Sequence, residues 1–232
     1  MDLIARGIAR ALALIFSLDA EVLRITLLSL QISGTATLVS VLLGISAGTA
    51  LALNRFPGRR ILVGLVNTSM GLPPVVVGLF VALMLWRSGP LGALDIIYTP
   101  AAMIAAQAIL AFPIVTGITL AAIQQIPPGF RLQVLSLGAT RLQMVWVLVK
   151  EARLPLMAAV MAGFGGAISE IGASIMVGGN IKGHTRVLTT AVVMETSRGN
   201  FDMAIALGII LFILAFSITL LLTFAQQRER RR

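Results

Sequence analysis

Glu170 is the acidic residue whose surroundings make its charge most costly. It lies in the apolar, glycine-rich stretch 156–178, which contains no lysine, arginine or histidine. A carboxylate at membrane depth is unfavourable unless it is paired, protonated or near water. We therefore predict that Glu170 and its neighbour Ser169 line a translocation pathway. A structural hydrogen bond to another helix is the alternative.

A second polar group, Asn67, Thr68 and Ser69, shortly precedes two adjacent prolines, Pro73 and Pro74. The prolines lack backbone N–H groups, so they free carbonyls that must be satisfied by neighbours or water. A broken helix beside polar side chains predicts a second part of the pathway lining. A plain packing kink is the alternative.

Other chemistry has few candidates. The sequence contains no G-x-x-x-x-G-K-[ST] loop, its only lysines are Lys150 and Lys182, and no H-E-x-x-H motif surrounds its only histidine, His184. We therefore expect no ATP hydrolysis and no enzyme activity in this chain. An intramembrane hydrolase built from Glu170 and a distant His184 is the remaining enzymatic alternative.

Composition indicates what must position these residues. Of 232 residues, 58% are hydrophobic and 12% charged, and the mean hydropathy is +0.98. This apolar content exceeds that of soluble domains. The net charge of +9 comes from short loops and a C-terminal tail, so nucleic acid is not a predicted partner. We expect an all-α polytopic membrane protein.

Five stretches have the length and apolarity of transmembrane helices. They cover residues 24–54, 61–86, 100–123, 156–178 and 203–225. In the first, Ala36, Ser40, Gly44 and Gly48 recur at every fourth position and predict a ridge for close helix packing. The third contains one polar residue, Gln107.

The N-terminal segment, residues 1–22, precedes these spans. Arg6 and Arg10 lie one helical turn apart, with Ile4, Ile8 and Leu12 on another side. The segment is short and charged for a span, so we predict an interfacial amphipathic helix. A further transmembrane span is the alternative.

Residues 124–155 form the long basic interruption of the apolar sequence. Pro127 and Pro128 end the preceding helix, and residues from Phe130 onward favour helix again. Gly138 divides this run, so we predict a helix, a turn and a second helix. A solvated loop between two spans is the alternative.

Charge asymmetry predicts the orientation. With five spans, the central loop 124–155 and the tail 226–232 lie on the same side, which we expect to be cytoplasmic by the positive-inside rule. That side would collect Arg55, Arg59, Arg60, Arg131, Arg141, Lys150, Arg153, Arg228, Arg230, Arg231 and Arg232.

Several strings give the chain, over residues 23–225, a resemblance to the permease subunits of type I ABC importers. They are LGAT at 137–140, GLPPVVVGL at 71–79, SGPLG at 88–92, SEIGA at 169–173 and VGGNIKGHTRVLTT at 177–190. The last string resembles the tungstate permeases, relatives of the molybdate and sulfate permeases. The resemblance implies a MetI-like core of five transmembrane helices, plus the N-terminal amphipathic helix.

The resemblance also implies functional residues. The central loop would couple to an ATPase through Leu135, Ser136, Leu137, Gly138, Ala139, Thr140 and Arg141. The family's usual Glu-Ala-Ala before the loop glycine is replaced here by Leu-Gln-Val at 132–134, and its Leu-Pro after the loop by Val-Lys at 149–150. Four residues would lie at the extracytoplasmic mouth, where they attract an anion, contact a binding protein or simply pack: Asn180, Lys182, His184 and Arg186.

The implied function is that of the membrane subunit of an importer in the plasma (inner) membrane of a prokaryote. Its implied partners are a second copy of itself, cytoplasmic ATPase subunits that use ATP and Mg²⁺, an extracytoplasmic solute-binding protein and the lipid bilayer. No cofactor is expected in this chain. The alternatives are an importer of molybdate, sulfate or another solute, a transporter driven by an ion gradient, and a membrane scaffold without transport.

Overall fold

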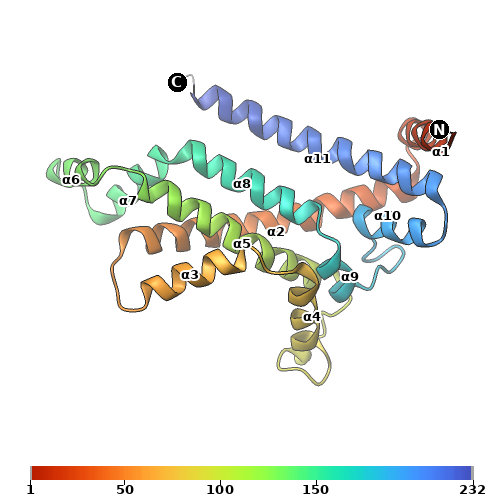
Figure 1. The fold of residues 1–232 in the computed structure, drawn as a ribbon, viewed down its shortest axis with the longest axis horizontal. Coiled ribbons are helices and arrows are strands. Elements are labelled where there is room, and N and C mark those ends of the chain that lie inside the picture. The colour runs from red at the N-terminus through yellow and green to blue at the C-terminus, as the bar shows by residue number, and fades with distance from the viewer. Residues whose placement is uncertain (1, 231–232) are drawn as a thin grey trace.

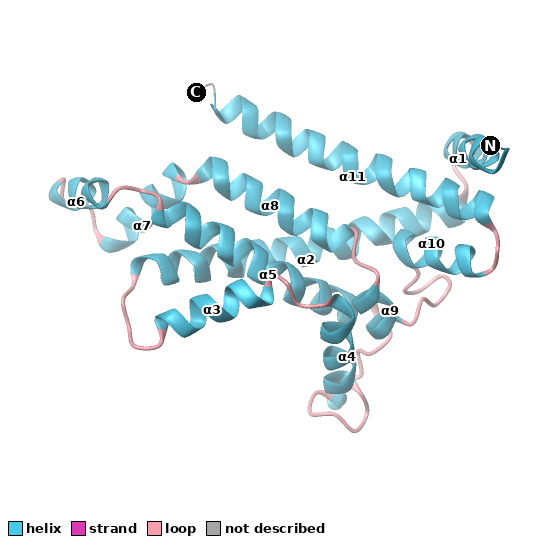
Figure 2. Cartoon of the chain, viewed as in Figure 1, coloured by secondary structure: helices cyan, strands magenta, loops and turns pink. Residues whose placement is uncertain are grey.

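The computed structural model describes residues 2–230, a range that consists of helices, turns and loops without any strand. The long helices run side by side along the longest axis of the molecule (Figures 1 and 2). We call its two ends the α6–α7 end and the α1–α10 end (Figure 1). The helices are α1 (Asp2–Phe16), α2 (Ala20–Leu53), α3 (Arg59–Ser69), α4 (Pro74–Leu85), α5 (Pro100–Gln124), α6 (Pro128–Ser136), α7 (Arg141–Glu151), α8 (Arg153–Ile168), α9 (Gly172–Gly178), α10 (Leu188–Ser197) and α11 (Phe201–Arg230), with one 3-10 turn, η1 (Gly92–Leu94).

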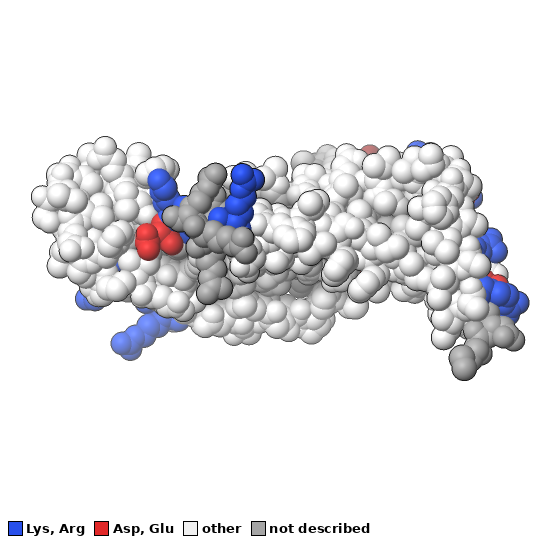
Figure 3. Space-filling view, turned by 90° about the horizontal axis from the view of Figure 1, so that it is seen from above, with Lys and Arg blue, Asp and Glu red and all other residues white. Residues whose placement is uncertain are grey.

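Three of these helices, α2, α5 and α11, are each long and apolar enough to cross a membrane. Two broken pairs bring the number of candidate spans to five: α3 with α4, bent by 107°, and α8 with α9, bent by 57°. The prolines account for the first break, as the sequence predicted. The second break lies inside the stretch 156–178, for which the sequence had predicted one span without a break. On the face shown in Figure 3, charged side chains gather toward the two ends.

The ridge of small residues on α2 packs against α5. Ala36, Ser40, Gly44 and Gly48 are all buried, and the Ser40 hydroxyl donates to the Ala108 carbonyl oxygen at 3.0 Å. A Cβ atom on Gly48 would lie 2.6 Å from the carbonyl oxygen of Thr116, which is closer than van der Waals contact allows. The predicted role of this ridge in helix packing is therefore confirmed.

The second halves of the two broken spans, α4 and α9, pack on each other. A Cβ atom on Gly78 would lie 2.5 Å from the Cα atom of Ala173, and one on Gly172 would lie 2.6 Å from the Val75 side chain. Two glycines, one on each helix, thus allow the backbones to approach closely. Buried Val77, Val81 and Val177 belong to the apolar cluster around this contact.

Helix α1 lies across the beginning of α11 at the α1–α10 end. It is seen nearly end-on in Figure 1, whereas α11 runs along the picture. Ala11 is buried, a Cβ atom on Gly7 would collide with the Ile205 side chain, and the Arg6 Nε atom lies 3.9 Å from the Asp202 carboxylate. The predicted N-terminal helix is therefore present, and it is fixed to α11 by small residues.

Candidate functional site

The α6–α7 corner forms an exposed, well-defined turn. Gly138 has a φ of +84°, a left-handed conformation that favours glycine, and no heavy atom lies within 4 Å of the position its Cβ would take. Next to it, Leu137 is 87% exposed. Thr140 begins α7 with a capping box, in which its hydroxyl oxygen accepts from the Gln143 N–H at 3.3 Å and the Gln143 side chain accepts from the Thr140 N–H at 2.8 Å.

The predicted coupling residues therefore occur together at this corner. Leu135, Ser136, Leu137, Gly138, Thr140 and Arg141 are exposed, and Ala139 is half-buried. Three further large apolar side chains, Leu132, Leu142 and Trp146, are also exposed on α6 and α7. A capped turn that presents apolar side chains to solvent has the chemistry of a contact surface for another protein.

The corner is anchored to the rest of the fold on one side and bordered by a cavity on the other. Leu148 of α7 is fully buried in an apolar cluster with Ile123 and Ile126, and Arg131 donates to the Ile123 carbonyl oxygen at 3.1 Å. A cavity of about 1090 Å³ lies beside α6, and its lining includes Phe130 of α6 and Glu151 of α7. A displacement of α6 and α7 would therefore be transmitted to α5 and α8.

The polar residues before the first break lie at the end of α3. The side chains of Asn67 and Thr68 are exposed, that of Ser69 is half-buried, and none of the three forms a hydrogen bond with the part of the chain that the structure describes. Pro73 and Pro74 are exposed beside them. These side chains are therefore free to contact something outside this protomer.

Glu170 occupies the second break, where it caps α9. It is 7% exposed, and its two carboxylate oxygens accept hydrogen bonds from the backbone N–H groups of Ala173 and Ser174, both at 2.9 Å. The Thr189 hydroxyl donates to the Glu170 backbone carbonyl at 3.1 Å, and Gln107 donates to the Ser174 hydroxyl at 3.1 Å. These contacts favour the structural alternative for Glu170, and its role in the pathway stays a prediction.

The other predicted pathway residue at this break is exposed. The hydroxyl of Ser169 donates to the carbonyl oxygens of Gly165 and Gly166 in its own helix. Ser169 therefore sits at the surface of the bend, whereas Glu170 points into it. The two breaks adjoin, because a Cβ atom on Gly172 would lie 2.6 Å from the side chain of Val75, which directly follows Pro74. Asn67, Thr68 and Ser69 end α3 before the first break, and Ser169 and Glu170 lie at the second.

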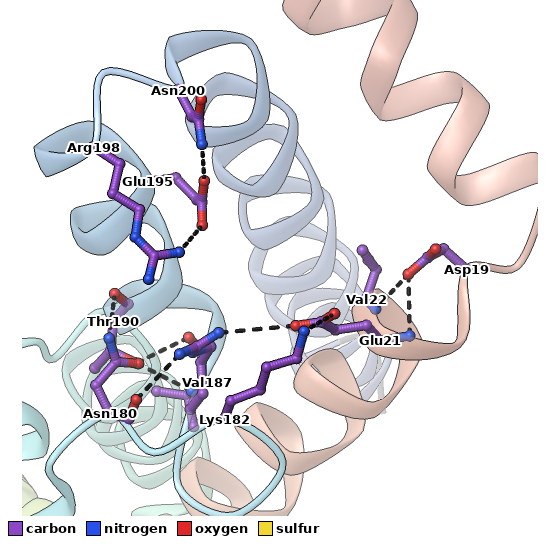
Figure 4. A network of polar contacts seen from close by, with 11 residues as sticks. Asp19, Glu21, Val22, Asn180, Lys182, Val187, Thr190, Glu195, Arg198 and Asn200 are labelled. Atoms are coloured by element: carbon purple, nitrogen blue, oxygen red, sulfur yellow. Dashed lines mark hydrogen bonds and ion pairs between the residues drawn. The ribbon is translucent and has the colours of Figure 1, made fainter.

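The loop that follows α9 is fastened to the start of α2 by charge (Figure 4). The Nζ atom of Lys182 lies 2.7 Å from the Glu21 carboxylate, and an Nη atom of Arg186 lies 3.8 Å from it. Arg24 donates to the Gly183 carbonyl oxygen at 2.6 Å, and the buried hydroxyl of Thr185 donates to the carbonyl oxygen of Gly178. Much of this charge therefore holds the loop in place.

The remaining two residues predicted for the mouth differ in their surroundings. The Asn180 side-chain amide donates to the Thr190 carbonyl oxygen at 3.4 Å, whereas His184 is exposed. Sequence reasoning missed Glu21, the partner of both cations. No local pattern could have identified it, because it lies about 160 positions earlier in the chain.

No group of three or more possible metal ligands occurs among the residues that the structure describes.

Comparison with known proteins identifies relatives along nearly the whole chain. Residues 40–231 match the family model for the inner membrane component of binding-protein-dependent transport systems. The tungstate uptake system permease protein TupB of Peptoclostridium acidaminophilum is 39% identical over 227 residues, covering 98% of this chain and all of that protein. A probable anion ABC transporter permease protein of Haloferax volcanii is 40% identical over 202 residues, covering 85% of this chain and 87% of that protein.

Solved structures agree with the fold. A chain of the MetNI methionine ABC transporter, crystallised in inward-facing conformations, superposes with a TM-score of 0.70 at 20% identity, covering 93% of this chain and 97% of that one. A bacterial ABC transporter involved in the import of the acidic polysaccharide alginate gives a TM-score of 0.74 at 20% identity, covering 89% of this chain and 79% of that one. The predicted all-α, MetI-like fold is confirmed.

Proposed function

Because this chain belongs to the family of inner membrane components of binding-protein-dependent transport systems, we propose that it is the permease subunit of an ATP-driven importer of tungstate. The observation that carries the proposal is the alignment along 98% of the chain with a tungstate uptake permease. As a member of this family, the chain is a transport component, not an enzyme. ATP and Mg²⁺ would bind to a separate ATPase subunit.

The α6–α7 corner is the element that we assign to coupling. An ATPase that binds residues 135–141 at this corner would displace α6 and α7, and the contacts of Leu148 and Arg131 would pass the movement to α5 and α8. Alternating access requires that nucleotide and solute bind the two states of the permease unequally. Nucleotide binding in the ATPase would act on this chain through the corner and shift the equilibrium between the two states of the permease.

The corner and the C-terminus would then both lie in the cytoplasm. The end of α11 points toward the α6–α7 end (Figure 1), which also carries the basic turn around Arg55, Arg59 and Arg60. This placement follows the positive-inside rule. The α1–α10 end would be extracytoplasmic and would receive the solute from a binding protein.

The solute pathway would lie between two copies of the chain. The free side chains of Asn67 and Thr68, with Ser69 and Ser169 nearby on the breaks, are exposed or half-buried in this protomer. Facing a second copy, they would offer hydrogen bonds to an oxyanion without the tight binding that would slow its release. The buried carboxylate of Glu170 would shape the α8–α9 bend rather than contact the solute.

A second candidate function is import of a different anion, favoured by the relative described as a probable anion permease. Molybdate and sulfate are the competing tetrahedral oxyanions. A transporter driven by an ion gradient is less supported, because both oxygens of Glu170 already accept backbone hydrogen bonds. An ion-coupled carboxylate would need to exchange those partners in each cycle.

The test is tungstate uptake into vesicles that contain this chain, its ATPase and its binding protein, comparing Gly138→Val with Gly138→Asn. A left-handed backbone costs an L-residue about 1–2 kcal/mol, and asparagine tolerates it better than a β-branched residue. We expect Gly138→Val to lower ATP-dependent uptake about tenfold and Gly138→Asn to retain most of it, with both variants folded.

Three results would contradict the proposal. Equal uptake by wild type and Gly138→Val would remove the corner from coupling. Uptake of molybdate or sulfate in preference to tungstate would assign another solute, and uptake that persists without ATPase but collapses with the proton gradient would assign another mechanism.

A further inference from the structure

Helix α1 has three distinct faces, one of which contacts nothing in the part of the chain that the structure describes. Gly7, Ala11 and Leu14 form the face toward α11, and Arg6 and Arg10 form a basic face beside it. The third face is apolar and exposed, and Phe16 at its end is 82% exposed. Its large side chains are Ile4, Ile8, Leu12, Ile15 and Phe16. A helix with this pattern is typical of a membrane interface.

The position of α1 along α11 agrees with an interfacial depth. Contacts of α1 involve Asp202 and Ile205, in the first turns of α11. From residue 203 to 225, α11 carries no charge, a length of about 35 Å at 1.5 Å per residue. This length matches a hydrocarbon core of about 30 Å. Helix α1 therefore crosses α11 where the apolar part of α11 begins, at the level of lipid headgroups.

A cavity of about 560 Å³ opens beside the basic face of α1. It is bounded by the start of α2, the loop after α9 and the α10–α11 turn, with the apolar Leu3, Phe201 and Met203 in its wall. Its charged lining comprises five cations and three carboxylates: Arg6, Arg10, Lys182, Arg186 and Arg198 with Glu21, Glu195 and Asp202. The lining side chains thus leave an excess of two positive charges.

The three carboxylates do not form ion pairs with all five cations. Lys182 and Arg186 share Glu21, Arg198 pairs with Glu195 at 3.4 Å, and Arg6 is 3.9 Å from Asp202. Arg10 makes no ion pair or hydrogen bond within the part of the chain that the structure describes. The Nε atom of Arg186 is also buried without a partner. The cavity therefore has donors available for an anion.

We propose that α1 and this cavity bind an anionic phospholipid of the bilayer. The acyl chains lie along the apolar face of α1 and the exposed apolar flank of α11, which includes Phe212, Ile213 and Phe216. The headgroup phosphodiester enters the cavity and accepts hydrogen bonds from Arg10 and Arg6. A soluble partner would leave the apolar face of α1 in water. A lipid would cover the apolar face with its acyl chains and the basic face with its headgroup. With the orientation proposed above, the lipid belongs to the outer leaflet.

The first test measures the depth of α1. The sequence contains no cysteine, so a nitroxide can be attached to one introduced site in the whole transporter. We compare Ile8→Cys, on the apolar face, with Ala13→Cys, on the side of the basic face. In vesicles, the label at position 8 is expected to collide with dissolved oxygen in the lipid, and that at position 13 with a water-soluble nickel complex. Equal access of both labels to the nickel complex would overturn the proposal.

The second test measures lipid selectivity by native mass spectrometry of the transporter after reconstitution in mixed phosphatidylglycerol and phosphatidylcholine. We expect retained phosphatidylglycerol to fall about fivefold in Arg10→Gln, because a basic residue near an anionic surface contributes about 1 kcal/mol. Arg10→Lys should retain it. Arg87→Gln is the matched control, since Arg87 is exposed after α4 and does not line this cavity.

Three outcomes of this second test would refute the lipid site. One is unchanged phosphatidylglycerol in Arg10→Gln, and another is equal loss of both lipids. The third is displacement of the lipid by soluble tungstate, which would assign the cavity to a small oxyanion. If Arg10→Gln instead weakens binding-protein association and leaves lipid retention unchanged, the surface is a protein-docking site. Lipid retention does not depend on transport, so these results are separable from those on the proposed function.

Discussion

Replacing Glu170 by alanine distinguishes a structural carboxylate from one that serves the transport pathway. In the structure, both oxygens of Glu170 accept backbone N–H groups of α9 at 2.9 Å, and the side chain is buried. Glu170→Ala removes both acceptors and leaves the N–H groups of Ala173 and Ser174 without a partner. Helix α9 has only seven residues, so it has little other means of fixing its start.

The magnitude follows from the two hydrogen bonds. A hydrogen bond to a charged group contributes about 1.5–3 kcal/mol, so we expect the loss of two in Glu170→Ala to lower the free energy of unfolding by about 3–6 kcal/mol. Glu170→Gln keeps one amide oxygen as an acceptor and should lose about half as much. Ser169→Ala is the matched control, because its hydroxyl bonds only within its own helix. Its expected loss is below about 0.5 kcal/mol.

Denaturant unfolding of the purified permease in mixed micelles measures these differences, and tungstate uptake is measured in parallel. A structural role predicts that uptake falls only in proportion to the amount of folded protein. The reasoning is refuted if Glu170→Ala unfolds like the wild type yet transports nothing. That result would return Glu170 to the translocation pathway.

Two further predictions test the packing and the charge network. Gly48→Ala should destabilise the fold by about 1–3 kcal/mol, because its Cβ would lie 2.6 Å from a backbone oxygen of α5. Gly34→Ala on the same helix should instead stabilise it by about 0.5–1 kcal/mol, since open space surrounds that position; the same sign for both in denaturant unfolding would contradict this packing. Glu21→Gln releases Lys182 and Arg186 and should cost about 0.5–1 kcal/mol at low ionic strength. The cost should shrink in 1 M salt, so a salt-independent Tm difference would argue against the ion pairs.

Apolar length made the main helices predictable. The sequence predicted a span at 100–123, and α5 runs from Pro100 to Gln124, because proline at a first helical position and a continuous apolar run are local signals. The turn around Gly138 was predictable because its signal is also local. Its positive φ favours glycine, and the flanking segments favour helix.

Contacts between distant residues could not be predicted in this way. The pairing of Glu21 with Lys182 and Arg186 joins residues about 160 positions apart in the sequence, and each residue alone resembles an ordinary surface charge. The bend at Glu170 did have a local signal, because an acidic side chain three positions before Ala173 can accept a hydrogen bond from the Ala173 N–H. The sequence analysis had instead assigned Glu170 to the pathway. The costly carboxylate was recognised, but the backbone donors that satisfy it were not.

The pairing of α4 with α9 has a consequence for biosynthesis. These helices are separated by roughly 90 residues, which a ribosome adds in about 5–20 s at 5–20 residues per second. During that interval α4 has left the ribosome, but the surface that covers Gly78 and Val81 has not been made. The second span therefore enters the membrane unfinished, and its final packing waits for translation of the fourth.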